Sequence, residues 1–375
     1  MKPKTKKAIV AVTNDLITDQ RVNRSCLLLK DRGYEVCLVG RQLNSSPKMD
    51  ERSYATFRFK LLFNKGPMFY ASYNLRLFLF LMTRRTDLIF SNDLDTLVAC
   101  WLASIIKGNK LVYDTHEYFT GVPELMERPM VRRIWKSIES FIFPKLKTVI
   151  TVNDSIAKLY RDEYGNQIHV VRNVPMGNSF QGSAAPSFEV RSTLGIGSND
   201  KVIILQGSGI NRDRGAEETV MAMKYLEHVK LILLGGGDSL PELKRLSVEH
   251  GVSEKVLFLP RMPYAQMMQY TAACDLGLTL DKDTNINYRF SLPNKIFDYV
   301  RAGIPILASR LPEVEKIISG YDIGTFIRSH EPMILAEDIR HAIEDKEAIA
   351  RHRKNLQLAA LELTWENETK NFPDI

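Results

Sequence analysis

An alternation of strands and helices constrains this chain more than any other feature, because it runs along the sequence, stops once and starts again. In the N-terminal half, helical patterns separate short strand-like runs at residues 7–13, 34–39, 88–90, 110–113 and 148–151. Strands that are joined through helices pair in parallel, so this pattern predicts an α/β protein with a doubly wound sheet. From residue 202 onward, a second series of strands and helices predicts a second domain of the same kind.

The two series are separated by a Gly-, Ser- and Pro-rich stretch at residues 173–188, which is typical of a linker. A chain of 375 residues also exceeds the usual size of one domain. We therefore expect an N-terminal domain over residues 1–180 and a C-terminal domain over residues 181–350, followed by a charged helical tail.

The composition is ordinary for a globular protein, with 45% apolar and 25% charged residues. Four cysteines are scattered without CxxC or Cys/His metal spacing, which indicates a reducing compartment and no zinc site. The N-terminal MKPKTKKAIVAV leads directly into a strand-like run rather than into a cleavable apolar segment. We therefore expect a cytoplasmic protein.

The net charge of +7 is unevenly distributed. Residues 1–180 hold 28 basic and 17 acidic side chains, a balance of +11, whereas residues 181–375 hold 23 and 27, a balance of −4. This asymmetry indicates an anionic partner for the N-terminal half. No nucleic-acid motif is present, so an anionic membrane surface is the remaining candidate partner. A basic surface that serves only solubility explains the charge equally well.

Residues 68–82 (MFYASYNLRLFLFLM) form the most apolar segment, and Arg84 and Arg85 follow it. This segment is too short to span a bilayer and is interrupted by Arg76. It is interpreted either as a buried helix of the first domain or as an interfacial helix at the headgroup level.

The segment at residues 291–309 (SLPNKIFDYVRAGIPILAS) predicts a helix that begins after Pro293, ends at Gly303 and leads into a buried strand. Lys295 and Asp298 are three residues apart, so they project from one face near the helix N-terminus. That terminus itself favours anions. A phosphate beside the Lys and a sugar hydroxyl beside the Asp would suit a nucleotide sugar.

Two Gly-rich turns follow strands of the second series. The first, GSGINRDRG at residues 207–215, places Arg214 directly before a helix, and the second is the triple Gly of LILLGGGD. Arg212 stands where a dinucleotide fingerprint needs a third Gly. Each turn alone is equally well read as an ordinary tight turn, but loops after parallel strands meet at one sheet edge, where ligands bind.

In the first series, YDTHEYF places His116 between Asp114 and Glu117 at the end of a strand. This histidine is a candidate general base, hydroxyl binder or metal ligand, with a structural role as the alternative. Asp-x-Asp also occurs at Asp93/Asp95 and at Asp281/Asp283. Such pairs can hold a divalent metal, but they are short and frequent by chance, and we predict no metal site.

These motifs together resemble a retaining glycosyltransferase of the GT-B fold, family 4 type, over nearly the whole chain. The resemblance lies in SLPNKIFDYVRAGIPILAS, GINRDRGAEE, LILLGGGD, VLFLPRMPYAQMMQY, DTHE and NDLITDQRVNRS. It implies two Rossmann-like domains that face each other across a cleft. It also implies that the C-terminal helix, residues 351–375 with Trp365, returns to the N-terminal domain.

The resemblance implies a role for each candidate residue. The catalytic residues would be His116, Arg214 and Lys295, with both cations at the donor diphosphate and His116 at the sugar and acceptor. The donor would be bound by Gly209, Arg214, Gly236, Arg261, Asn294, Lys295 and Asp298. The acceptor side would be formed by Asp19, Asp114, His116 and Glu117. No metal or other cofactor is implied; the partners would be a nucleotide sugar and an acceptor glycan or lipid-linked glycan.

The sequence departs from the family pattern at Phe290, where the family often carries a second Glu, so which sugar is transferred stays open. Asp298 also stands where the family usually has Glu. A role in cell-surface polysaccharide or glycolipid synthesis, with hexose transfer at the inner membrane face, is the expected function. Two alternatives stay open, namely a nucleotide-sugar epimerase of similar fold and a non-catalytic nucleotide- or glycan-binding protein.

Overall fold

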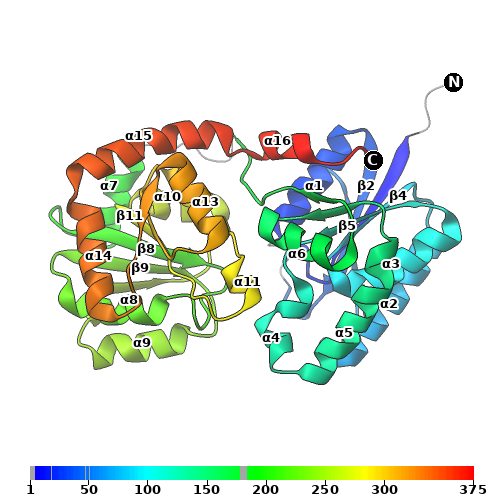
Figure 1. The fold of residues 1–375 in the computed structure, drawn as a ribbon, viewed down its shortest axis with the longest axis horizontal. Coiled ribbons are helices and arrows are strands. Elements are labelled where there is room, and N and C mark those ends of the chain that lie inside the picture. Colours follow the sequence, from blue (N-terminus) through cyan, green and yellow to red (C-terminus); the bar gives the residue numbers. More distant parts are fainter. Residues whose placement is uncertain (1–4, 18, 47, 50, 178–183) are drawn as a thin grey trace. The chain divides into compact units, whose positions relative to one another are not determined.

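The computed structural model describes residues 5–17, 19–46, 48–49, 51–177 and 184–375. The chain divides into two compact units, of which the first comprises Met1–Asn173 and Thr369–Ile375 and the second Val174–Glu368. Each unit is built around one parallel β-sheet (Figure 1). The α/β, doubly wound fold class that the alternation predicts is therefore confirmed for both units.

Unit 1 has a seven-stranded parallel sheet in the order β3-β2-β1-β4-β5-β6-β7. Its strands are β1 (Lys6–Ala11), β2 (Tyr34–Gln42), β3 (Ala55–Lys60), β4 (Leu88–Asn92), β5 (Lys110–Thr115), β6 (Val149–Thr151) and β7 (Ile168–Val170). Its helices are α1 (Gln20–Asp31), α2 (Gly66–Thr83), α3 (Leu94–Lys107), α4 (Pro123–Met126), α5 (Pro129–Ile142) and α6 (Asp154–Tyr164). The order reverses beside β1, which is the switch point where such sheets bind ligands.

Unit 2 has a six-stranded parallel sheet in the order β10-β9-β8-β11-β12-β13. Its strands are β8 (Lys201–Gly207), β9 (Val229–Gly235), β10 (Val256–Leu259), β11 (Leu276–Thr279), β12 (Ile306–Ala308) and β13 (Gly324–Phe326). Its helices are α7 (Ala184–Thr193), α8 (Ala216–Ala222), α9 (Leu240–Glu249), α10 (Tyr264–Ala272), α11 (Ile286–Arg289), α12 (Asn294–Ala302), α13 (Pro312–Tyr321), α14 (Pro332–Glu344), α15 (Lys346–Glu362) and α16 (Trp365–Glu368).

The core of each unit lies between the sheet and the helices that cover it. In unit 2, Val202, Ile204 and Ile306 pack toward α12 and α15, while Ile203 and Leu205 pack toward α8 and α14. Successive residues of one strand thus enter cores on opposite faces, as the period of two along a strand requires. A strand that is buried on both faces needs a continuous apolar run, which is what VIIL at the start of β8 supplies.

The unit boundaries differ from those drawn on the sequence. The predicted boundary residues 180 and 181 lie outside the described residues, whereas the contacts divide the chain after Asn173. Residues 351–368 of the predicted returning helix belong to unit 2, because α15 packs on α12 and Leu356 lies in the unit 2 core. The chain rejoins unit 1 only at Thr369.

The last residues are held in unit 1 by aromatic and cationic contacts. The Phe372 ring is stacked on Phe90 of β4 with a centroid separation of 6.1 Å. The guanidinium of Arg32 lies 4.9 Å from the Phe372 ring centroid and donates a hydrogen bond of 2.8 Å to the Pro373 carbonyl. Unit 1 is therefore completed by a segment that follows the whole of unit 2 in the sequence.

The apolar segment at residues 68–82 lies within α2. Phe69, Tyr73, Leu77 and Leu81, spaced four apart, are buried in the unit 1 core, which is the arrangement expected for a buried helix. The opposite side carries exposed Leu75 and Leu79. Over the described ranges of the chain, no helix combines the length and the apolarity that crossing a bilayer requires.

Candidate functional site

Arg214 is positioned by the loop that connects β8 to α8 in unit 2. Gly215, at φ +76°, forms the N-cap of α8, and a Cβ at this position would overlap the Leu280 carbonyl and side chain. Only glycine combines this backbone conformation with such a close approach. The backbone N–H of Lys282 donates to the Asp213 carbonyl over 2.9 Å. The loop is thereby fixed against the segment that follows β11.

Asp281, at the end of β11, is the ion-pair partner of Arg214. Arg214 Nη1 lies 2.6 Å from Asp281 Oδ2, and the Asp281 side chain is only 1% exposed. The guanidinium also lies 4.2 Å from the Tyr288 ring centroid. Burial acts to lower the pKa of Arg214, but the Asp281 carboxylate and the Tyr288 hydroxyl group raise it above its usual range. Arg214 is thus a cation held on its edge by a carboxylate and beside an aromatic ring.

Two atoms of this ion pair are still unsatisfied. Asp281 Oδ1 and Arg214 Nε are both buried and have no hydrogen-bond partner among the described residues. Buried polar atoms usually have partners, so this cluster can accept additional interactions when a ligand is bound.

Lys295 is the second residue of α12 and lies near the same two charges. Burial lowers the pKa of Lys295, the Asp281 carboxylate opposes this shift, and the Arg214 guanidinium adds to it. In the part of the chain that the structure describes, Lys295 makes no ion pair closer than 4.0 Å. The N-terminus of α12 after Pro293 adds backbone N–H donors and a positive dipole end. This constellation of Lys295, Arg214 and a helix N-terminus can bind a polyanion.

Asp298, one turn further along α12, is hydrogen-bonded on both oxygens. The Tyr264 hydroxyl donates to Oδ1 over 3.0 Å, and Gln206 Nε2 donates to Oδ2 over 3.1 Å. Gln206 is itself oriented by Thr271, whose hydroxyl donates to Gln206 Oε1 over 2.6 Å. Asp298 is thereby held in one orientation as an ionisable acceptor on the first turns of α12.

The two Gly-rich turns of unit 2 contact each other. Gly236 N–H donates to the Gly207 carbonyl over 3.2 Å, and Ile210 N–H donates to the Gly236 carbonyl over 2.7 Å. Arg261 donates to the Ser208 carbonyl, and a Cβ at Gly236 would overlap its guanidinium. Gly209 and Gly236 therefore lie in one joined loop pair with Arg261 against it. Asn294 is the exposed first residue of α12.

In unit 1, His116 lies directly after β5 with a carboxylate near each ring nitrogen. Nδ1 is 3.2 Å from Asp93 Oδ2, and Nε2 is 3.5 Å from Asp114 Oδ2. The backbone N–H of His116 also donates to Asp93 Oδ1 over 2.9 Å. A neutral imidazole carries a proton on only one nitrogen, so two carboxylate neighbours favour the doubly protonated ring. Burial acts to lower the pKa of His116, but Asp93 and Asp114 together raise it to about 9.

Asp114 is buried and is paired with Arg21 of α1. Arg21 donates from Nε over 3.0 Å and from Nη2 over 2.7 Å to the two Asp114 oxygens, and from Nη1 to the Val171 carbonyl over 2.7 Å. Burial alone would raise the pKa of Asp114, but the Arg21 guanidinium and His116 lower it to about 2. The carboxylate is therefore kept ionised, and it orients His116 rather than taking its proton.

The other predicted acceptor-side residues, Asp19 and Glu117, make local contacts of their own. Asp19 is the N-cap of α1, where Oδ1 accepts from the Val22 N–H over 3.0 Å and Oδ2 accepts from Asn14 over 2.8 Å. This is an ordinary capping role. Glu117 has an exposed side chain, and its backbone carbonyl accepts from Thr115 over 2.7 Å.

Within each Asp-x-Asp pair, the two carboxylates bind different partners. Asp281 binds Arg214, whereas Asp283 pairs with Arg289 over 3.1 Å. Asp93 binds His116, whereas Asp95 accepts a hydrogen bond from Thr13, and burial raises the pKa of Asp95 to about 7. Each pair therefore splits between two partners. Over the described residues, no group of three or more His, Cys, Asp or Glu side chains is arranged to hold a metal ion.

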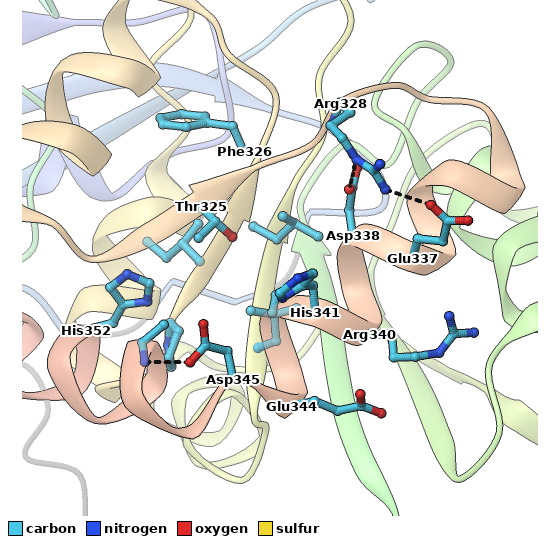
Figure 2. Close-up of a pocket in the computed structure, with 16 residues that line it drawn as sticks. Thr325, Phe326, Arg328, Glu337, Asp338, Arg340, His341, Glu344, Asp345 and His352 are labelled. Carbon is cyan, nitrogen blue, oxygen red and sulfur yellow. Dashed lines mark hydrogen bonds and ion pairs between the residues drawn. The ribbon is translucent and has the colours of Figure 1, made fainter.

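A separate hollow of unit 2 contains none of the predicted residues. Figure 2 shows this hollow, with a volume of about 980 Å³, beside β12, β13, α14 and α15. Arg328 donates within it to Asp338 over 2.6 Å and to Glu337 over 2.8 Å. This arginine is already neutralised by two carboxylates, so it does not mark an anion site.

Several residues of these clusters are not evident from the sequence. Asp281, Gln206 and Tyr264 in unit 2, and Arg21 in unit 1, are brought to the site by distant parts of the chain. Of these, only Asp281 carried a signal, as half of an Asp-x-Asp pair. In the structure its ion-pair partner is Arg214.

Family models match both units of the chain. "Glycosyltransferase Family 4" matches residues 22–174, and "Glycosyl transferases group 1" matches residues 189–359. Together with the two parallel sheets, these matches identify the chain as a glycosyltransferase of the GT-B fold, family 4 type. No curated protein matches the sequence.

Solved structures of low sequence identity share this fold. Sucrose-phosphate synthase from Thermosynechococcus elongatus has a TM-score of 0.80 at 16% identity, with 97% of this chain and 96% of that chain covered. HepE from Anabaena, solved with UDP and glucose, has a TM-score of 0.73 at 19% identity, with 97% of each chain covered. WaaG, a glycosyltransferase involved in lipopolysaccharide biosynthesis, has a TM-score of 0.69 at 15% identity, with 98% of this chain and 100% of that chain covered.

The ionisation of His116 leads to a testable prediction. Because its pKa is raised to about 9 from an ordinary value near 6.5, His116 stabilises unit 1 fully below pH 6.5 and progressively less as the pH rises toward 9. Proton NMR should therefore show one imidazole with a titration midpoint near 9, and His116→Asn should remove that signal. Asp93→Asn should move the midpoint toward 6.5. A midpoint near 6.5 in the wild type would contradict the prediction.

Proposed function

We propose that this protein is a retaining glycosyltransferase that moves a sugar from a nucleotide diphosphate sugar to an acceptor hydroxyl. The observation that carries the proposal is the cluster of Arg214, Asp281 and Lys295 at the C-terminal edge of the unit 2 sheet. Two cations beside a helix N-terminus, with one buried counter-charge, suit a ligand that bears more than one negative charge. The UDP and glucose bound by HepE, a protein of the same fold, support a ligand of this class.

In this proposal, Arg214 and Lys295 bind the diphosphate and stabilise the negative charge that develops on it as the glycosidic bond breaks. Preorganised charges are effective here because they need no reorientation during the reaction. Asp281 and Tyr288 hold the Arg214 guanidinium in advance, which is the required preorganisation. Asp298, oriented by Tyr264 and Gln206, accepts hydrogen bonds from the ribose hydroxyls.

We assign His116 to the sugar and acceptor, as a hydrogen-bond donor rather than as a base. A base must be unprotonated, whereas the carboxylates of Asp93 and Asp114 favour the protonated ring. In a protonated imidazole Nδ1 faces Asp93, whereas Nε2, which has no hydrogen-bond partner among the described residues, can donate to a hydroxyl or phosphate oxygen. The acceptor is proposed to be a glycan or lipid-linked glycan of cell-surface polysaccharide or glycolipid synthesis, and the transferred sugar a hexose.

The functional test is a donor screen followed by analysis of the product. Thermal stabilisation by UDP, GDP, ADP and dTDP should identify one base, because a ligand that binds only the folded state raises its stability. With the matching nucleotide sugar and a hydroxyl acceptor, NMR should show that the anomeric configuration is kept. An inverted linkage would refute retention. Epimerised nucleotide sugar without acceptor would favour the epimerase, and binding without turnover would favour a non-catalytic protein.

Replacing Lys295 by Ala should reduce turnover by roughly 100-fold or more, because the variant loses a charge that stabilises the leaving diphosphate. The fold should persist, since Ala is the best helix former. Lys354→Ala, an exposed lysine on α15, is the matched control and should keep wild-type turnover. Near-normal turnover of the Lys295 variant would remove this residue from the site.

Replacing Asp281 by Asn should tighten diphosphate binding by about tenfold, because a counter-charge several ångströms from the phosphates opposes them by about 1–3 kcal/mol. The Asn side chain keeps an acceptor for Arg214, so the guanidinium stays in place. Titration calorimetry with the nucleoside diphosphate at low and high salt measures the change, which should shrink at high salt. Asp283→Asn is the control. Weaker binding in the Asp281 variant would mean that Asp281 acts mainly by holding Arg214.

We also propose that transfer needs no metal ion, because Asp281 is engaged by Arg214 and both Asp-x-Asp pairs split between partners. Turnover should therefore persist in excess EDTA. Loss of activity that Mg²⁺ or Mn²⁺ restores would assign a metal role to Asp281 and Asp283 or to Asp93 and Asp95.

A further inference from the structure

One surface of unit 1 combines exposed apolar side chains with positive charge. It is formed by the outward sides of α2, α3 and α5, which lie side by side (Figure 1). The Trp135 ring of α5 packs edge-on against Tyr70 of α2 at 5.1 Å, and the Trp101 ring of α3 packs against Phe141 of α5 at 5.6 Å. These contacts join the three helices into one layer, whose outward side is called the α2–α3–α5 face below.

The α2–α3–α5 face is apolar well beyond what core packing requires. Each helix already buries a separate set of side chains, such as Tyr73 on α2, Ala103 on α3 and Ile142 on α5. Yet six further large apolar side chains, two from each helix, are between 54% and 61% exposed: Leu75, Leu79, Ile105, Ile106, Ile134 and Phe141. Extended apolar surface of this kind on a soluble protein marks an interaction site.

The exposed charges on the three helices are of one sign. Arg76 and Arg133 are exposed on α2 and α5, and Lys145 lies over the Phe141 ring. The acidic residues within the three helices are only Asp95 and Glu139. Asp95 is hydrogen-bonded to Thr13, and Glu139 is fully buried, where it accepts from Lys136 and Tyr164. No fully exposed carboxylate therefore opposes an anion on this face.

We propose that the α2–α3–α5 face docks on an anionic lipid bilayer. The exposed leucines, isoleucines and Phe141 would enter the headgroup–acyl boundary, and the basic side chains would lie at the level of the lipid phosphates. Charge complementarity favours this occupant, because lipid phosphates supply the missing anions over an area as wide as the face. A helix of 18 residues such as α2 is about 27 Å long, which gives the face the extent of many headgroups.

This inference differs from the one drawn on the sequence. Residues 68–82 supply a buried side to the unit 1 core, and the proposal uses the exposed residues of the same helix for the interfacial contact. Four of the six exposed apolar side chains come from α3 and α5, which the sequence pattern did not single out as an interfacial segment. If the acceptor is lipid-linked, as proposed, docking would bring the enzyme to the membrane that holds it. The docking proposal does not depend on the reaction, because vesicle binding is measured without turnover.

The test is co-sedimentation with vesicles of equal parts phosphatidylglycerol and phosphatidylcholine, compared with phosphatidylcholine alone. The wild type should bind the anionic vesicles at low salt and be partly released at high salt, because salt screens the charges but not the apolar contacts. Ile134→Ser with Phe141→Ser, and separately Arg76→Glu with Arg133→Glu, should each weaken binding about tenfold or more. Leu358→Ser with Leu361→Ser is the control, since both leucines are exposed on α15 of unit 2.

Three other outcomes would contradict the docking proposal. Equal binding to both vesicle types would exclude recognition of anionic lipid, and unchanged binding of the two face variants would exclude this face. A wild type that ignores vesicles and forms a dimer abolished by Phe141→Ser would assign the face to a second copy of the chain. Circular dichroism confirms that the variants fold. Loss of glycosyl transfer to a soluble acceptor with normal vesicle binding would refute the proposed function but not the docking.

Discussion

Buried charge in this protein is organised by the carboxyl ends of parallel strands. A parallel sheet directs all its strands toward one edge, so residues far apart in the sequence meet there. In unit 2, the ends of β8 and β11 bring Arg214 to Asp281, beside Lys295 of α12. In unit 1, the ends of β4 and β5 bring Asp93 to His116. A charge removed from water needs a partner, and the sheet supplies the partner from another strand.

The fold was predictable where the sequence carries a strong period. The buried strands β1, β8 and β9 are continuous apolar runs, and the helices between them have one apolar side, so the alternation identifies them. The strands β3, β7 and β13 were missed for physical reasons. β3 is an edge strand in which half-buried Arg58 and exposed Lys60 interrupt the apolar residues, and β7 and β13 have only three residues each. Such short strands form because a neighbouring strand is already in place, which no local pattern records.

The candidate site was predictable only in its local part. Lys295 and Asp298 share one helical turn, and Arg214 stands in a Gly-rich loop before a helix, so spacing alone marks them. Their partners are set by tertiary contacts across 67 to 93 positions: Asp281 for Arg214, Gln206 for Asp298 and Arg21 for Asp114. Asp19 shows that local spacing can also be ambiguous, because an Asp before a helix can be an N-cap as readily as a ligand. Individual charged residues could thus be found in the sequence, but not the partners that they meet in the fold.

The contact between Phe372 and Phe90 has a consequence for how the protein is made. Unit 2 is inserted within unit 1, because the last residues of the chain complete the structure that the first residues begin. A ribosome releases the chain from its N-terminus, so unit 1 cannot be completed until residues 369–375 have been made, after the whole of unit 2. While unit 2 of the glycosyltransferase is being synthesised, Phe90 and Arg32 therefore lack their contacts with the C-terminal segment.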